Sequence, residues 1–225
     1  MSLSANTSPT LDNVTPKPEM PVETGAPGTP DRLLFIQSFS GDFSDELRVF
    51  DLSPCVCPST FTEIRSNKFY GAVETAAKDR QNDRSAWAYE LKRETFSSNL
   101  QIHDASDGGD VAADLDLTIL KRYGTWKLKF PPGSRHSIHD LDIRAVSILR
   151  KQETFVKDGI LYMWDMTGGG KRGALHKTVG GKKALIAEFV AKSWFKNSCV
   201  LAVDTKEVDD VVALGTCVAA LNRDV

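Results

Sequence analysis

The chain has 225 residues and a mass of 24.7 kDa, with 41% hydrophobic and 26% charged residues. This composition is typical of a soluble globular protein with enough chain to bury a hydrophobic core. The 28 Lys and Arg nearly balance the 30 Asp and Glu, and the resulting net charge of −2 excludes a globally basic protein, so we expect no nucleic-acid partner.

The first 31 residues hold six of the ten prolines and no aromatic residue. Such a segment cannot bury enough apolar surface to offset the entropy of ordering, so we expect residues 1–31 to be a disordered tail and residues 32–225 to form one domain. The tail lacks the basic and apolar regions of a secretory leader. Four cysteines in 225 residues favour a reducing compartment. We expect a cytoplasmic protein, peripheral at membranes if its ligand is a lipid.

From residue 33 onward, short runs of alternating apolar and polar residues are separated by Gly, Pro, Asn, Asp and Ser. Alternation of this kind predicts β-strands. The clearest run is 125–130, where Trp126, Leu128 and Phe130 share one face and Lys127 and Lys129 share the other. The predicted strands are 33–37, 47–52, 69–75, 86–93, 115–121, 125–130, 143–149, 160–165, 174–178, 184–191 and 199–203. Many short strands without intervening helices favour an antiparallel β-barrel or, alternatively, a β-sandwich.

The last segment departs from this β pattern. Residues 211–221 contain no charged residue, so a helix here would be apolar on every side and would have to be buried. Asp204 is a suitable N-cap with Glu207 three residues later, and the run is long for a strand, so we predict a core helix over 205–222. A final core strand is the alternative, because periodicity does not separate the two for Val-rich runs.

Three strand-like runs, at residues 159–165, 184–189 and 199–204, lead into the apolar residues 211–221. Strands followed by one apolar C-terminal helix in this way resemble the tubby C-terminal-like superfamily, which includes the LURP-one-related and phospholipid-scramblase proteins, and in particular its small fungal members. It implies a closed antiparallel β-barrel wrapped around the C-terminal helix. Members of the superfamily bind phosphoinositides through a basic surface, so the resemblance also implies an anionic lipid ligand.

Motifs that would carry chemistry are weak. Residues 168–173 match G-x-G-x-x-G, but no helix is predicted after them, so a hairpin loop is favoured over a phosphate-binding loop. His136 and His139, with Asp140 or Asp142, have a spacing that could suit a metal, but nothing completes the site. Cys55 and Cys57 likewise lack a partner pair. We therefore assign no catalytic residue, metal or cofactor.

Two further features of the sequence bear on catalysis. Asp114 and Asp116 alternate with leucines on a predicted strand, so they are expected to form its solvated face rather than a carboxylate pair for acid–base catalysis. The chain contains no G-x-S-x-G nucleophile elbow. An enzyme would therefore need a site that is not visible in the sequence.

The charge distribution carries the main functional prediction. Residues 121–200 hold 16 Lys and Arg against 6 Asp and Glu, a net charge of +10. If the turns in this segment meet at one end of a barrel, they would form a surface for anionic headgroups. The candidate ligand-binding residues are Lys121, Arg122, Lys127, Lys129, Lys171, Arg172, Lys177, Lys182 and Lys183. The alternative interpretation is that these side chains only solvate outer strand faces.

We therefore expect a non-enzymatic binding module for anionic, phosphoinositide-like lipid headgroups. One alternative is an effector-like protein-interaction scaffold that recruits protein partners through the tail. Another is an enzyme with an unrecognised site.

Overall fold

The computed structural model describes residues 28–38, 46–93, 99–105, 108–117, 124–146, 152–167, 171–191 and 198–223. Within these ranges twelve strands form one closed antiparallel barrel, so the predicted barrel is confirmed and the β-sandwich is not supported. The strands are β1 (Arg32–Ser38), β2 (Glu46–Asp51), β3 (Trp87–Arg93), β4 (Asn99–Asp104), β5 (Val111–Asp116), β6 (Thr125–Lys129), β7 (Leu141–Ala145), β8 (Gln152–Lys157), β9 (Ile160–Thr167), β10 (Arg172–Val179), β11 (Lys182–Ala191) and β12 (Cys199–Val203). Strands that follow one another in sequence are neighbours in the sheet, and β12 pairs with β1 to close it.

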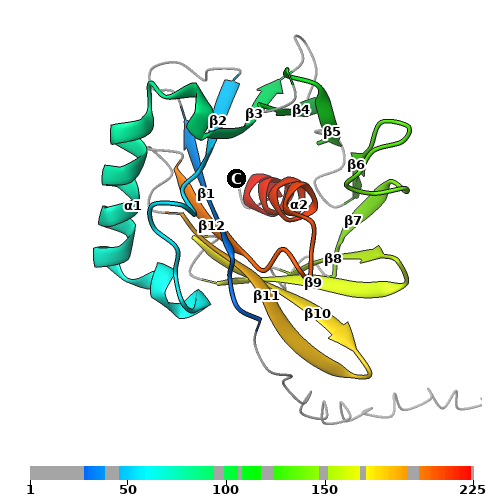
Figure 1. Ribbon diagram of the computed structural model, residues 1–225. Coiled ribbons are helices and arrows are strands. Elements are labelled where there is room, and N and C mark those ends of the chain that lie inside the picture. The colour runs from blue at the N-terminus through cyan, green and yellow to red at the C-terminus, as the bar shows by residue number, and fades with distance from the viewer. Residues whose placement is uncertain are drawn as a thin grey trace, which may run out of the picture.

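The helical segments are η1 (Phe61–Arg65), α1 (Asn67–Arg80), η2 (Arg84–Ala86) and α2 (Asp210–Arg223). Figure 1 looks along α2 and shows it inside the ring of strands, whereas α1 lies outside, beside β1 and β12. Residues 211–220 of α2 are all buried, which agrees with a helix that is apolar on every side. No helix in the described part of the chain combines the length and the apolar character needed to cross a membrane.

The core helix begins later than predicted, at Asp210. Asp209 precedes it, and its carboxylate accepts hydrogen bonds from the amides of Val211 at 2.9 Å and Val212 at 3.2 Å. Asp204, the predicted cap, instead accepts from the amide of Thr29 at 3.0 Å and from that of Lys206 at 3.2 Å. Asp204 is thus used to anchor the N-terminal segment and its own turn, and the helix starts only where the chain enters the barrel.

The predicted strand 69–75 is wrong, because these residues belong to α1. Tyr70, Val73 and Ala77 recur at helical spacing and are the buried residues of α1. The Ser66 hydroxyl caps the helix by accepting from the amide of Phe69 at 3.1 Å. A second core forms where α1 and η1 pack on the outer faces of β1, β2 and β12. Burial on one side of the barrel therefore selected a helix in a segment whose short-range alternation suggested a strand.

Other sequence predictions differ in detail. β4 and β8 were not predicted, although Leu100 and Ile102 in β4 alternate correctly toward the core. β5 covers 111–116 rather than 115–121, and residues 118–121 lie outside the described ranges. The tail predicted over 1–31 includes residues 28–31, which contact the barrel, while residues 1–27 lie outside the described ranges.

Candidate functional site

Seven of the nine basic residues predicted to bind a ligand lie in the described part of the chain, and these seven do not gather at one end of the barrel. Lys121 and Arg122 lie outside the described residues. Lys127 and Lys129 are on β6, Lys177 is on β10, Lys171 and Arg172 are at the start of β10, and Lys182 and Lys183 are at the start of β11. Because β10 and β11 are antiparallel, the last two pairs lie at opposite ends of the same hairpin.

Acidic partners are seen for Lys127, Lys129 and Lys177. The Nζ atom of Lys127 lies 3.7 Å from Asp142, and that of Lys129 lies 3.5 Å from Asp116. Both are cross-strand pairs at half-exposed positions, where an ion pair contributes about 0–1 kcal/mol. The Nζ atom of Lys177 contacts Glu207 in the turn that precedes α2. These lysines therefore match the alternative interpretation of solvated or structural charges. Asp116, one of the paired carboxylates of the sequence analysis, belongs to the same solvated face.

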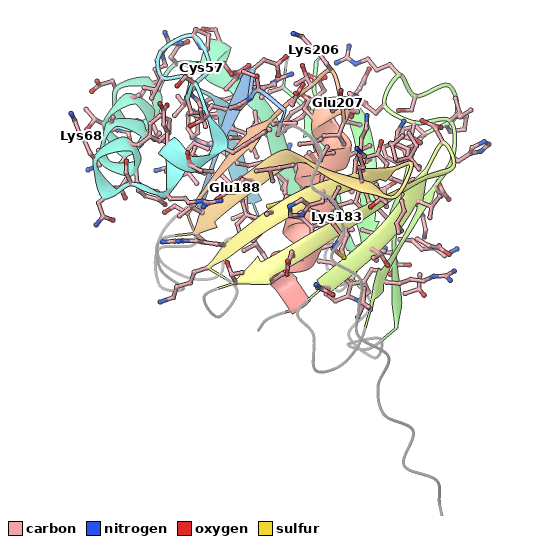
Figure 2. All side chains as sticks on the ribbon, turned by 90° about the horizontal axis from the view of Figure 1, so that it is seen from below. Cys57, Lys68, Lys183, Glu188, Lys206 and Glu207 are labelled. Atoms are coloured by element: carbon pink, nitrogen blue, oxygen red, sulfur yellow. The ribbon has the colours of Figure 1, made fainter. Side chains whose placement is uncertain are left out.

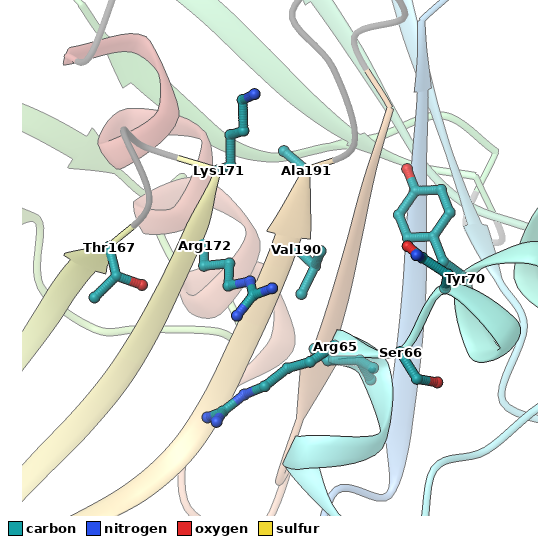
Figure 3. Close-up of a pocket in the computed structure, with 10 residues that line it drawn as sticks. Arg65, Ser66, Tyr70, Thr167, Lys171, Arg172, Val190 and Ala191 are labelled. Atoms are coloured by element: carbon teal, nitrogen blue, oxygen red, sulfur yellow. The ribbon is translucent and has the colours of Figure 1, made fainter.

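Lys171 and Arg172 line a cleft of about 510 Å³ between the η1–α1 junction and the ends of β9, β10 and β11. We call it the α1 cleft (Figure 3). Its other polar lining residues are Arg65, Ser66, Asn67, Tyr70 and Thr167. A volume of this size is typical of pockets that hold small ligands or headgroups.

Arg65 enters the α1 cleft from a segment that the sequence analysis did not connect with the basic residues. Its Nε and Nη2 atoms donate to the two carboxylate oxygens of Glu188 on β11, at 2.6 and 2.8 Å. Glu188 is only 2% exposed, whereas Arg65 is exposed. The hydrogen bonds that Arg65 donates to Glu188 raise the pKa of Arg65, so its guanidinium stays charged. This bidentate pair holds η1 against the barrel and fixes one wall of the cleft.

The electrostatics of the α1 cleft favour an anion. Lys171 and Arg172 are exposed and have no carboxylate partner among the described residues. The N-terminus of α1 opens at the same place, and its first turn contains no acidic residue to neutralise the helix dipole. The charge of Arg65 is balanced by Glu188, so the excess positive charge comes from Lys171, Arg172 and the helix end.

The anchoring of α1 keeps this wall in place. Ile64 and Tyr70 are buried in the second core, and the Tyr70 hydroxyl lies 3.0 Å from the Ser198 hydroxyl before β12. The described lining of the cleft contains no His, Asp, Glu or Cys. The charged groups of the lining, Arg65, Lys171 and Arg172, are all cations, so the arrangement suits binding of an anion.

A second polar cluster lies at the entrance to the barrel, around the start of α2. The Nδ1 atom of His136 is 3.0 Å from Asp209, and the Tyr89 hydroxyl donates to Asp210 at 2.7 Å. Arg32 also contacts Asp210. Burial and the Asp210 carboxylate raise the pKa of Tyr89, so its phenol remains protonated and can donate. We interpret this cluster as an anchor for the N-terminus of α2.

The metal pattern weighed in the sequence does not form. His136 turns to Asp209, whereas Asp140 accepts from the backbone amide of Phe130 at 3.1 Å and His139 is exposed. One ligand atom from each of His136, Asp209 and Asp210 lies within 4.8 Å of the others. The carboxylates of Asp209 and Asp210 already accept hydrogen bonds from protein donors. The guanidinium of Arg32 contacts Asp210, so its positive charge would repel a metal ion at this position.

The glycine motif lies between two paired strands, and the cysteines form no disulfide. Thr167 pairs with Arg172 across antiparallel β9 and β10, as expected for a hairpin rather than a phosphate-binding loop, and residues 168–170 lie outside the described ranges. Gly180 and Gly181 join β10 to β11 with φ of +58° and +78°, which favours glycine at both positions. All four cysteines are free thiols, and Cys55 and Cys57 are exposed.

Comparisons of this chain with models of protein families, with curated proteins and with solved structures found no match. Evidence about function therefore comes from the barrel and its clefts.

Proposed function

We propose that this protein is a non-enzymatic binding module that takes a phosphate-bearing lipid headgroup in the α1 cleft. The observation that carries the proposal is the meeting of Lys171 and Arg172 with the unneutralised N-terminus of α1. Guanidinium groups bind phosphate oxygens in a bidentate manner, and ammonium groups bind them as point charges. Backbone amides at a helix N-terminus add donors for the same oxygens.

The fold supports the same proposal. A closed twelve-strand barrel around a C-terminal helix is the architecture implied by the resemblance to the tubby C-terminal-like superfamily. The proposal therefore includes membership of that superfamily, with the small fungal proteins as the nearest counterparts. It also implies a cytoplasmic protein that is peripheral at membranes.

The test is co-sedimentation of the full chain with phosphatidylcholine vesicles, with and without a phosphoinositide, at low salt. We expect binding only to the phosphoinositide vesicles, and we expect Lys171→Glu/Arg172→Glu to abolish it because the cleft then repels the headgroup. The matched control is Lys78→Glu/Arg93→Glu, which makes the same change of charge at exposed positions away from the cleft. Equal loss in both double variants would show only a response to net charge, and would contradict the proposal.

A competition experiment identifies the source of the phosphate. A soluble inositol phosphate should displace the protein from the vesicles if the α1 cleft reads the headgroup, whereas inorganic phosphate at the same concentration should not. Displacement by both at equal concentrations would show a general anion site and would overturn the assignment to lipid headgroups. Binding should also fall as salt rises, because exposed charges are screened.

A further inference from the structure

The outer face of the barrel carries an apolar row at the end of β10 remote from the α1 cleft. Val156 on β8 pairs with Leu161 on β9, Leu161 pairs with Thr178 on β10, and Thr178 pairs with Lys183 on β11. The inward neighbours of the first two, Phe155 and Tyr162, are buried in the core. Side chains alternate across a strand, so this row points outward.

Two members of the row are apolar and open to solvent. Val156 is 55% exposed and Leu161 is 43% exposed. We call these two residues the hairpin-tip cluster. Lys183 continues the row, whereas Val179 and its partner Lys182 alternate to the opposite side of β10 and β11. Exposed aliphatic side chains beside a lysine suit a surface that is apolar inside and anionic at its boundary.

The same outer face leads back to the α1 cleft. Gly173 points into the core, where a Cβ atom would lie 2.2 Å from the Phe189 ring, so Arg172 beside it points outward. Arg172 and Thr178 are six positions apart on β10, or about 20 Å of strand. Figure 1 shows α1 beside β1 and β12, so among the described residues no helix covers the outer side of β8, β9 and β10.

The charges on this face permit an anionic partner. Asp158 in the β8–β9 turn pairs with Lys157 at 2.6 Å, and Glu188 pairs with Arg65. Asp165 also points outward, because its partner across the sheet is Ala174 next to inward-facing Gly173. Lys183 and Glu188 lie at different positions along β11, as Figure 2 shows. Arg172 and Lys183 on this face, together with Lys171 at the cleft, outnumber the carboxylate of Asp165, so the face carries an excess of positive charge.

We infer that the outer face of β8–β11 lies against an anionic bilayer, with a headgroup in the α1 cleft and the hairpin-tip cluster inserted among the lipids. The inference rests on the proposed function and extends it from a headgroup site to a defined orientation on the membrane. The α1 cleft contributes an electrostatic part of the free energy of membrane binding, which salt screens. The hairpin-tip cluster contributes an apolar part, which salt does not screen.

The first experiment measures insertion. Leu161→Trp in the full chain is mixed with phosphoinositide vesicles that contain brominated phosphatidylcholine, which quenches tryptophan in the acyl region. We expect a blue shift and quenching beyond those of the wild-type protein. Thr75→Trp, on the exposed side of α1, is the matched control and should show neither change.

The second experiment measures the contribution to affinity. Val156→Thr/Leu161→Thr keeps residues that favour strands while removing apolar surface, so the fold is preserved. We expect about tenfold weaker binding, by the same factor at low and high salt, because the lost contribution is apolar. Ile138→Ser is the control, since it removes an 81% exposed apolar side chain from the β6–β7 connection.

The outcomes separate the two proposals. The orientation would be overturned, and the headgroup site left intact, if wild-type binding depends on Lys171 and Arg172 but the Leu161→Trp fluorescence is not quenched. Undiminished affinity of the Val156→Thr/Leu161→Thr variant would lead to the same conclusion. Loss of binding in Ile138→Ser but not in the Thr variant would overturn it too, since the barrel end would then face the bilayer. No binding by the wild-type protein to any vesicle would overturn both.

Discussion

At the scale of single residues, one hydrogen bond joins the core helix to the barrel wall. Trp164 on β9 is fully buried, and its indole Nε1 donates to the Thr216 hydroxyl of α2 at 3.0 Å. That hydroxyl in turn donates to the carbonyl of Val212 at 2.7 Å. Buried donors without partners are costly, so this pair specifies how α2 is rotated inside the barrel.

Thr216→Val should test this bond. Valine fills the same volume but leaves the Trp164 N–H without an acceptor, so the free energy of unfolding should fall by about 1–3 kcal/mol. Urea denaturation followed by circular dichroism measures the change. Thr125→Val, at a half-exposed strand position, is the control and should change stability by less than about 0.5 kcal/mol. Equal stability of the two variants would show that the bond does not stabilise the fold.

His176 makes the fold sensitive to pH. Burial lowers its pKa below the ordinary 6.5, Lys183 lowers it further, and Asp165 and Glu188 oppose the shift. The unfolded chain then binds a proton more readily than the folded chain. Stability is therefore fully present above the unfolded pKa and decreases as the pH falls through it toward the folded pKa.

The predicted consequence is a flatter pH profile in His176→Gln. Thermal unfolding between about pH 7.5 and 5.5 should show a smaller loss of stability in this variant than in the wild-type protein. His139→Gln removes an imidazole from an exposed loop and controls for the substitution itself. A wild-type slope that persists in His176→Gln would rule out this residue as a source of the pH dependence.

At the scale of elements, the two helices are stabilised by opposite sides of the same barrel wall. α2 packs on inward side chains, and its Gly215 lies close to Leu128, where a Cβ atom would approach the leucine methyl at 2.7 Å. α1 packs on the outer faces of β1, β2 and β12. The strands beneath α1 are therefore apolar on both faces, as in β12, where all five residues are buried.

A charge placed on the core helix should prevent folding. Val212 and Leu214 are fully buried. An unpaired carboxylate at either position costs several kcal/mol against a total stability of about 5–15 kcal/mol, so Val212→Asp and Leu214→Asp should each abolish soluble expression. Val146→Asp, at a 47% exposed position, is the matched control and should express normally. Soluble, cooperatively folding Val212→Asp and Leu214→Asp proteins would contradict the packing of α2.

At the scale of the whole molecule, closure joins the two ends of the described chain. β1 pairs with β12, and the residues before β1 continue this contact. The amide of Gly28 donates to the carbonyl of Leu185 at 2.8 Å, and Asp31 accepts from both the amide and the hydroxyl of Thr205 at 2.8 Å. The N-terminal segment thereby holds the turn from which α2 starts.

Truncation should locate the stabilising boundary of the domain. A chain that starts at residue 28 should unfold at the same urea concentration as the full chain, because the Pro-rich segment offers little apolar surface to bury. A chain that starts at residue 32 loses the contacts of Gly28, Thr29 and Asp31, and its free energy of unfolding should be lower by about 1–3 kcal/mol. Equal stability of the two truncated chains would show that residues 28–31 do not hold the turn.

Local patterns in the sequence were sufficient for much of the fold. Trp126 and Leu128 alternate with lysines, and the alternation alone predicted the inward and outward faces of β6. The absence of charge from residues 211–221 predicted that this segment is buried on all sides. Both inferences depend only on side chains within a few residues of one another, because strand and helix periods are local properties of the backbone.

The tertiary structure decided which distant residues meet. Arg65 and Glu188 are 123 positions apart, and their contact places Arg65 beside Arg172 only because the barrel closes and α1 packs on its outside. No local period specifies that contact. The pairing of β10 with β11 also separates Lys183 from Lys171, so the described lysines of this basic segment do not form one patch. Composition determined the amount of charge, whereas register and closure determined where that charge lies.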